Sequence, residues 1–97
     1  MRIHKVQNPV AIELDDSLIL EGDVSHVLSK LPNESVQSVI TSPPYWGLRD
    51  YGYEGQIGLE ASLHQFINRL VAVFSEIRRV LKNDGTLWLN IGDGYTS

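Results

Sequence analysis

The 97-residue chain contains no cysteine, and this absence excludes several classes of site at once. Without thiols there are no disulfides, no thiolate metal sites and no cysteine nucleophile. Histidine is scarce as well. His4, His26 and His64 stand far apart in the sequence, so they indicate no metal-binding cluster. We therefore predict that the protein holds no metal.

Long apolar runs are also absent, and the N-terminus lacks the apolar core of a signal peptide. We expect a soluble, cytoplasmic protein with no membrane partner. The chain has 8 lysine and arginine residues against 12 aspartate and glutamate residues, so its formal net charge is −4. This balance argues against a free-standing nucleic-acid binder, whose affinity depends on a basic face. DNA stays open as a substrate if another segment contacts the phosphates.

The first part of the chain predicts one strand and one helix. Residues 1–17 are poorly patterned, and we interpret them as an N-terminal arm with room for a short strand. Leu18–Glu21 is an apolar run typical of a buried strand. Asp23 is placed to cap a helix that begins at Val24, because its side chain can accept from backbone N–H groups one turn on. Pro32 ends that helix.

The remainder predicts strand, long loop, helix and strand. Val36–Thr41 is the second strand, and Ser62 with Gln65 forms a capping box that opens the longest helix. An apolar stripe follows one face of that helix: Leu63, Phe66, Ile67, Leu70, Phe74, Ile77 and Leu81. A turn at residues 83–85 precedes a third strand, Thr86–Ile91. Alternation of strands and helices indicates an α/β fold with a parallel sheet and right-handed crossovers.

Basic side chains gather in the last turns of the long helix, where they favour the helix dipole. They are Arg78, Arg79 and Lys82. A phosphate-binding patch is one interpretation, and a solvated helix face is the one we favour.

The most informative stretch is Thr41–Gly52, TSPPYWGLRDYG, directly after the second strand. Pro43 and Pro44 fix φ near −65° and lack N–H groups, so the backbone cannot continue a sheet ladder. The result is a stiff loop that carries the Ser42 hydroxyl and the Tyr45 ring. Open α/β sheets place their ligands at this kind of position, at the C-terminal ends of strands.

SPPY in this context, extended by WGLRDYG, resembles the catalytic loop of DNA amino-methyltransferases that use S-adenosylmethionine. The Ser form is typical of members that methylate the exocyclic amino group of cytosine. The resemblance implies a catalytic set of Ser42, Pro43, Pro44 and Tyr45. The Ser42 hydroxyl and the Pro43 carbonyl would accept hydrogen bonds from the target amino group, and Tyr45 would stack on a base flipped out of double-stranded DNA.

Further site residues follow from the same resemblance. Asp23 would lie near the adenine of the cofactor. The alternative interpretation is an N-cap of the following helix and nothing more. Trp46 would add to the base pocket or anchor the loop. Arg49 would contact the DNA backbone or form a local ion pair, and Asp93 would touch the target pocket.

The resemblance implies only part of a Rossmann-like catalytic domain, in residues 18–97. The family's Gly-rich cofactor turn opening a helix is not found in the sequence, and no target-recognition region is present. This pattern is similar to the N-terminal portion of enzymes in a permuted subgroup, in which the Gly-rich motif lies C-terminal to the proline loop. Such a portion would need a C-terminal half or a second subunit to complete it. The alternatives are adenine as the target, more remotely RNA or a protein amide, or an inactive fragment.

The family's sheet order makes one topological prediction. Leu18–Glu21 is separated from Val36–Thr41 by two strands that this chain lacks. Val36–Thr41 should instead lie beside Thr86–Ile91, in parallel.

Overall fold

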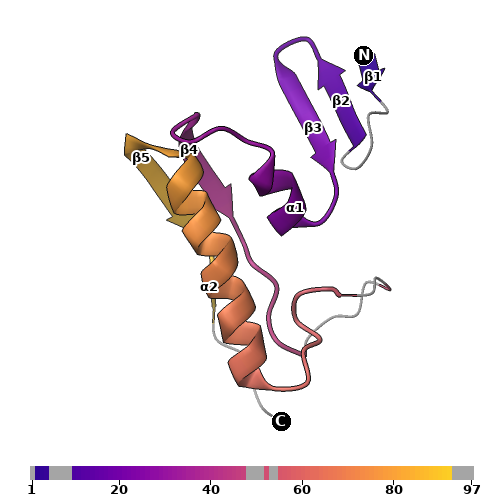
Figure 1. Ribbon diagram of the computed structural model, residues 1–97, viewed down its shortest axis with the longest axis vertical. Coiled ribbons are helices and arrows are strands. Elements are labelled where there is room, and N and C mark those ends of the chain that lie inside the picture. The colour runs from indigo at the N-terminus through magenta and orange to yellow at the C-terminus, as the bar shows by residue number, and fades with distance from the viewer. Residues whose placement is uncertain (1, 5–9, 48–51, 53–54, 93–97) are drawn as a thin grey trace.

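The computed structural model describes residues 2–4, 10–47, 52 and 55–92, which form a mixed α/β structure with two separate sheets (Figure 1). Its elements follow the chain in this order: β1 (Arg2–His4), β2 (Val10–Leu14), β3 (Ser17–Glu21), α1 (Val24–Ser29), β4 (Val36–Thr41), α2 (Leu63–Val80) and β5 (Leu81–Leu89). From β3 onward this is the predicted order of strand, helix, strand, loop, helix and strand.

The first sheet consists of β1, β2 and β3 in that order, with both pairs antiparallel. Asp15 and Asp16 form the turn between β2 and β3, and Leu14 pairs with Ser17 on either side of it. Figure 1 shows this sheet set apart from α2 and joined to the rest of the chain through α1.

Two predictions about this region are wrong. The segment predicted as an arm with room for one short strand contributes two strands, and the boundary at residue 17 falls at the start of β3. β3 is also not a buried strand, because four of its five residues are exposed. The polar pair Asp15–Asp16 contributes to the poor apolar patterning of residues 1–17. It is in fact a hairpin turn that brings the apolar runs on either side of it together.

α1 begins as the sequence predicts. Asp23 has extended backbone geometry, and its Oδ2 accepts from the N–H groups of Ser25 at 3.1 Å and His26 at 3.4 Å. The helix is short and packs along α2. Its end requires a second support, because the last carbonyls of a helix have no partner within the helix.

The second sheet confirms one part of the topological prediction, the parallel pairing of Val36–Thr41 with the last strand. The other part is wrong for this structure, because β3 pairs with β2 in a separate antiparallel sheet and does not share a parallel sheet with β4. β4 pairs with β5 in parallel, with Val39 opposite Leu87 and Ile40 opposite Trp88. α2 makes the crossover between the two strands and lies against one face of the pair (Figure 1). The connection is the one that parallel strands require, because a tight turn cannot join them.

β5 begins earlier than predicted, at Leu81, and the predicted turn lies inside it. Val36 pairs with Leu81 and Ser38 with Thr86, so residues 82–85 bulge out opposite Gln37 alone. Gly85 belongs to this bulge, where a Cβ would lie 2.9 Å from the Lys82 carbonyl oxygen and 3.0 Å from that of Gln37. The close approach of two backbones therefore requires glycine there.

The core is formed mainly by one face of α2, against which α1, β4 and Ile57 of the preceding loop pack. Its buried members are Ile57, Phe66, Val73, Ile77 and Val80, with Leu28, Val39, Leu70, Phe74 and Leu81 packed around them. The predicted apolar stripe is correct in its middle and wrong at its start, because Leu63 and Ile67 are exposed. Val73 and Val80 occupy the buried face instead, since the helix presents a slightly rotated side to the sheet.

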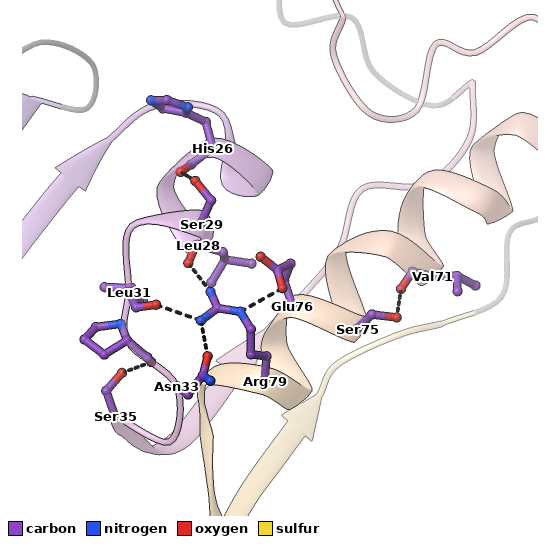
Figure 2. A network of polar contacts seen from close by, with 11 residues as sticks. His26, Leu28, Ser29, Leu31, Asn33, Ser35, Val71, Ser75, Glu76 and Arg79 are labelled. Atoms are coloured by element: carbon purple, nitrogen blue, oxygen red, sulfur yellow. Dashed lines mark hydrogen bonds and ion pairs between the residues drawn. The ribbon is translucent and has the colours of Figure 1, made fainter.

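Arg79 joins α1 to the C-terminal part of α2 (Figure 2). Its guanidinium donates to the carbonyl oxygens of Leu28 at 2.8 Å and Leu31 at 2.9 Å, and to Asn33 Oδ1 at 2.7 Å. Nε also donates to Glu76 Oε2 at 2.8 Å. Arg79 thus caps the end of α1 from another helix. It belongs neither to a phosphate patch nor to a solvated face, and both interpretations were wrong for this residue.

Two absences hold for the part of the chain that the structure describes. No helix there combines the length and apolar character needed to cross a membrane. No group of three His, Asp or Glu side chains is close enough there to bind a metal ion.

Candidate functional site

The proline loop, residues 42–46, begins where the β4–β5 ladder stops. The Asn90 N–H donates to the Thr41 carbonyl oxygen at 2.9 Å, which continues the pairing just beyond β5. On the β4 side, Ser42 is followed by Pro43 and Pro44. Because prolines have no N–H group to donate, the ladder cannot extend further. Figure 1 shows the chain leaving β4 at this edge of the sheet and continuing toward the N-terminal end of α2.

Tyr45 links the proline loop to the end of the neighbouring strand. Its hydroxyl oxygen accepts from the Gly92 N–H at 2.6 Å. A side-chain oxygen therefore satisfies a backbone N–H group just beyond the end of the β4–β5 ladder. The contact fixes the tip of the Tyr45 ring relative to β5, and the side chain is half-buried.

The remaining members of the predicted catalytic set lie along the same edge. Ser42 and Pro44 are exposed, and Pro43 is half-buried. No hydrogen bond engages the Ser42 hydroxyl among the described residues. Its oxygen is thus available to accept from an external donor.

The segment after the loop folds back onto it at Gly47 and Gly58. The Gly47 N–H donates to the Gly58 carbonyl oxygen at 2.6 Å. Gly58 has φ +113°, and a Cβ there would lie 2.8 Å from the Tyr45 carbonyl oxygen. Only glycine permits this approach, which brings the returning segment against the residue that carries the aromatic ring.

Glu60 is the centre of a polar cluster at the base of this loop. Its Oε2 accepts from Arg69 at 2.7 Å, and its Oε1 accepts from the Gly58 N–H at 2.8 Å. The Glu60 carbonyl oxygen accepts from Trp46 Nε1 at 2.9 Å. We call Trp46, Gly47, Gly58, Glu60 and Arg69 the loop base.

Arg69 completes the loop base from α2. Besides its ion pair with Glu60, it donates to the carbonyl oxygens of Gln56 at 3.1 Å and Gly55 at 2.6 Å. These bonds hold the returning segment against the helix. The planar guanidinium suits this task because its donors point in several fixed directions.

The environment of Glu60 favours its ionised form. Burial of the carboxyl raises its pKa, but the backbone N–H groups of Glu60 and Gly58 and the Arg69 guanidinium outweigh this effect. The pKa of Glu60 is therefore held below its ordinary value. The side chain is 5% exposed, so the pair is sheltered from solvent on the carboxylate side.

The other predicted site residues are not brought together with the loop. Asp23 caps α1, and no hydrogen bond joins it to the proline loop among the described residues. Trp46 anchors the loop base through its indole N–H, while the residue as a whole is 43% exposed. Arg49 and Asp93 lie outside the described residues.

Sequence reasoning missed the part of the loop base made by Glu60 and Arg69, and it missed the Tyr45–Gly92 contact. Glu60 and Arg69 come from different elements and carry no spacing signal. Gly58 marks a close backbone approach that the local sequence does not reveal.

Two shallow hollows elsewhere in the described residues, of about 390 and 400 Å³, are not part of this site. They lie beside the C-terminal turns of α2 and the bulge at residues 82–85, where the strands begin.

Comparison with known sequences identifies the family. The sequence model of a family described as DNA methylase matches residues 36–97, from the start of β4 through the proline loop to the end of the chain. This is more than half of the sequence. The chain belongs to the DNA methylase family. The resemblance to DNA amino-methyltransferases is thereby confirmed.

Individual relatives agree. The chain is 57% identical over 97 residues to the Type II methyltransferase M.Cfr9I of Citrobacter freundii, covering 100% of this chain and 32% of the relative. It is 59% identical over 95 residues to M.XycI of Xanthomonas campestris pv. cyanopsidis, covering 98% and 32%. For M.SmaI of Serratia marcescens the identity is 56% over 79 residues, which cover 81% of this chain and 27% of the relative.

The chain spans about a third of the length of the first two of these relatives. No solved structure matches it. The assignment to DNA methylation and restriction–modification methyltransferases thus comes from sequence similarity.

Proposed function

We propose that this chain supplies the target-base loop of a site-specific DNA methyltransferase that acts on the exocyclic amino group of cytosine. One observation carries the proposal: the proline loop leaves a parallel strand pair at its C-terminal edge and presents an exposed Ser42, whose hydroxyl has no hydrogen bond among the described residues. The family assignment supports the reaction class, and the serine favours cytosine over adenine.

The chemistry requires positioning more than a nucleophile. The amino group of cytosine is weakly nucleophilic because its lone pair is delocalised into the ring. The Ser42 oxygen and the Pro43 carbonyl would accept from its N–H groups, which localises the lone pair toward the incoming methyl group. The stiff backbone at Pro43 and Pro44 keeps both acceptors in place.

Tyr45 would stack on the flipped base. A base inside a duplex cannot reach a methyl donor, so it must leave the helix and find an aromatic surface. The hydrogen bond from Gly92 restrains the ring at its hydroxyl end, which favours a preorganised platform. Trp46, Arg49 and Asp93 are proposed as further DNA contacts.

The family implies S-adenosylmethionine as the methyl donor. When bound, it supplies the methyl group. Among the described residues Asp23 is the candidate contact, and no hydrogen bond joins it there to the proline loop. These residues therefore fit only part of a cofactor site. We propose that the 97 residues alone bind S-adenosylmethionine weakly or not at all.

We further propose that the β4–β5 pair is part of a larger, Rossmann-like sheet, completed by a C-terminal half or a second subunit. Relatives three times as long support this view. Without that part the chain is an inactive piece of the enzyme.

A chimera tests the proposed function. In it, this chain replaces the matching residues of the Citrobacter freundii relative. We expect the chimera to methylate mixed-sequence DNA and the chain alone to be inactive, as measured by transfer of radiolabelled methyl groups. Nucleoside analysis should give N4-methylcytosine. N6-methyladenine would favour the alternative substrate, and a chimera that folds but transfers no methyl group would contradict the proposal.

A further inference from the structure

Tyr45 is held at both of its ends. At the ring end, its hydroxyl oxygen accepts from the Gly92 N–H at 2.6 Å. At the backbone end, its carbonyl oxygen lies so close to Gly58 that a Cβ on that glycine would come within 2.8 Å of it. The direction of the ring therefore depends on the returning segment, residues 55–60, as well as on the end of β5.

The two residues after Tyr45 are tied to the same returning segment. The indole N–H of Trp46 donates to the Glu60 carbonyl oxygen at 2.9 Å, and the Gly47 N–H donates to the Gly58 carbonyl oxygen at 2.6 Å. Three consecutive residues of the target-base loop thus lean on one short piece of chain. Any movement of that piece would move the backbone from which the Tyr45 ring projects.

One carboxylate and one guanidinium give the returning segment its shape. Glu60 Oε1 accepts from the Gly58 N–H at 2.8 Å, so the side chain folds back onto its own segment. Arg69 donates to Glu60 Oε2 at 2.7 Å, to the Gly55 carbonyl oxygen at 2.6 Å and to that of Gln56 at 3.1 Å. Arg69 stands on α2, the helix that carries most of the core. The position of Gly58 is therefore set from the most rigid element of the chain.

A stacking surface requires this kind of support, because a reacting group works only when its neighbours hold it close to the productive geometry. We propose that Glu60 and Arg69 are positioning residues of the target-base loop, which fix the backbone of Tyr45, and hence the plane of its ring, through Gly58 and Trp46. Both carboxylate oxygens of Glu60 are engaged within the chain, so Glu60 acts on the loop and not on the base. The inference rests on the proposed function for what the ring does. It adds which residues hold the ring in place.

Steady-state kinetics of the full-length chimera with the Citrobacter freundii relative test the proposal. Glu60→Gln places an NH₂ group where one of the two carboxylate oxygens accepts, and Arg69→Lys replaces a fork of donors by a single ammonium. We expect kcat for methyl transfer to fall about tenfold in each variant, because the flipped base would be misaligned. KM for DNA should stay within about twofold, because neither side chain contacts DNA in this scheme.

The matched control is Glu76→Gln, the same chemical change in the other ion pair of α2. Glu76 lies 2.8 Å from Arg79 and has no contact with the proline loop among the described residues. All variants are assayed at a temperature where circular dichroism shows them to be fully folded. We expect kcat of Glu76→Gln to equal that of the parent. Glu60→Gln and Arg69→Lys chimeras that also match the parent in kcat would overturn the proposal.

Hydrogen exchange at the two indole N–H groups of the 97-residue chain gives a second measurement, which needs no methyl transfer. Trp46 is hydrogen-bonded to the returning segment, whereas Trp88 is 64% exposed and its indole N–H has no hydrogen bond among the described residues. Trp88→Phe assigns the two signals. We expect Glu60→Gln and Arg69→Lys to accelerate exchange at Trp46 severalfold and to leave Trp88 unchanged.

The two measurements separate this inference from the proposed function. Unchanged exchange at Trp46 in both variants would show that Glu60 and Arg69 do not hold the loop, and would overturn the inference. A parent chimera that folds but transfers no methyl group would contradict the proposed function alone, and the support of Tyr45 would then be decided by the exchange at Trp46.

Discussion

The two ends of α2 are each tied to a different part of the chain by one arginine. Near its start, Arg69 holds the carbonyls of the returning segment and the Glu60 carboxylate beside the proline loop. Near its end, Arg79 holds the carbonyls that close α1. Both guanidiniums donate to backbone carbonyls that have no backbone N–H partner. Arg69 thereby supports the loop of the candidate site, whereas Arg79 supports the packing of α1 on α2.

The difference lies in what each arginine stabilises. Arg79 joins two helices, so its loss should be felt by the whole fold. Arg69 joins a helix to the returning segment, which contributes only Ile57 to the buried core, so its loss should be felt mainly at that segment. Long-range polar contacts can thus be structural at one end of a helix and functional at the other.

The largest effect is expected at Arg79. Arg79→Ala leaves the carbonyls of Leu28 and Leu31 and the Glu76 carboxylate without their donor, and should lower the free energy of unfolding by about 3 kcal/mol. Urea denaturation followed by circular dichroism measures it. The matched control is Arg78→Ala, one residue away and exposed, which should change stability by less than about 0.5 kcal/mol. Similar losses in the two variants would remove the distinction between them.

Arg69→Ala should have a smaller global effect, about 1–2 kcal/mol, because the pair it breaks is partly exposed. Its main consequence should be local. Amide hydrogen exchange at Gly47 and Gly58 should accelerate, while that of α1 stays the same. The exposed neighbour Asn68→Ala serves as the control. If the amide hydrogens of α1 also exchange faster in this variant, the loop base and the α1–α2 contact are not energetically independent.

Acid should weaken the loop base through Glu60. Because its pKa in the folded chain is below the ordinary value of 4.5, its ionisation stabilises the fold above that pH. This contribution disappears as the pH falls through the lowered pKa. The stability difference between the parent and Glu60→Gln should therefore be constant near neutral pH and shrink below pH 4.5. Urea titrations across this range provide the measurement. A difference that does not change with pH would contradict an ionised Glu60.

Tyr45→Phe should give the smallest effect, a loss of about 0.5–1 kcal/mol from the missing acceptor for Gly92. The ring survives, so a chimera with this substitution should retain most of its methyl transfer, and Tyr45→Ala should lose more. Faster amide exchange at Gly92 in the Phe variant would confirm the contact. Equal activity of the Phe, Ala and parent chimeras would exclude a stacking role for Tyr45.

The sequence by itself determined the elements whose signals are local. Asp23 and Ser62 cap helices through bonds to N–H groups a few residues on, and the prolines after Ser42 end a ladder wherever they occur. The stretch Thr41–Gly52, which contains these prolines, also indicated the family. It predicted the parallel partner of Val36–Thr41 as well, although only through the family's sheet order.

Features that depend on distant partners could not be predicted from local patterns and became visible in the folded chain. The two turn residues Asp15 and Asp16 made a hairpin because apolar strands on both sides met across them. Glu60 and Arg69 found each other, and Arg79 found the end of α1, through packing that no local pattern encodes. Long side chains reach carbonyls wherever the fold leaves them unpaired, and that position is set by three-dimensional packing.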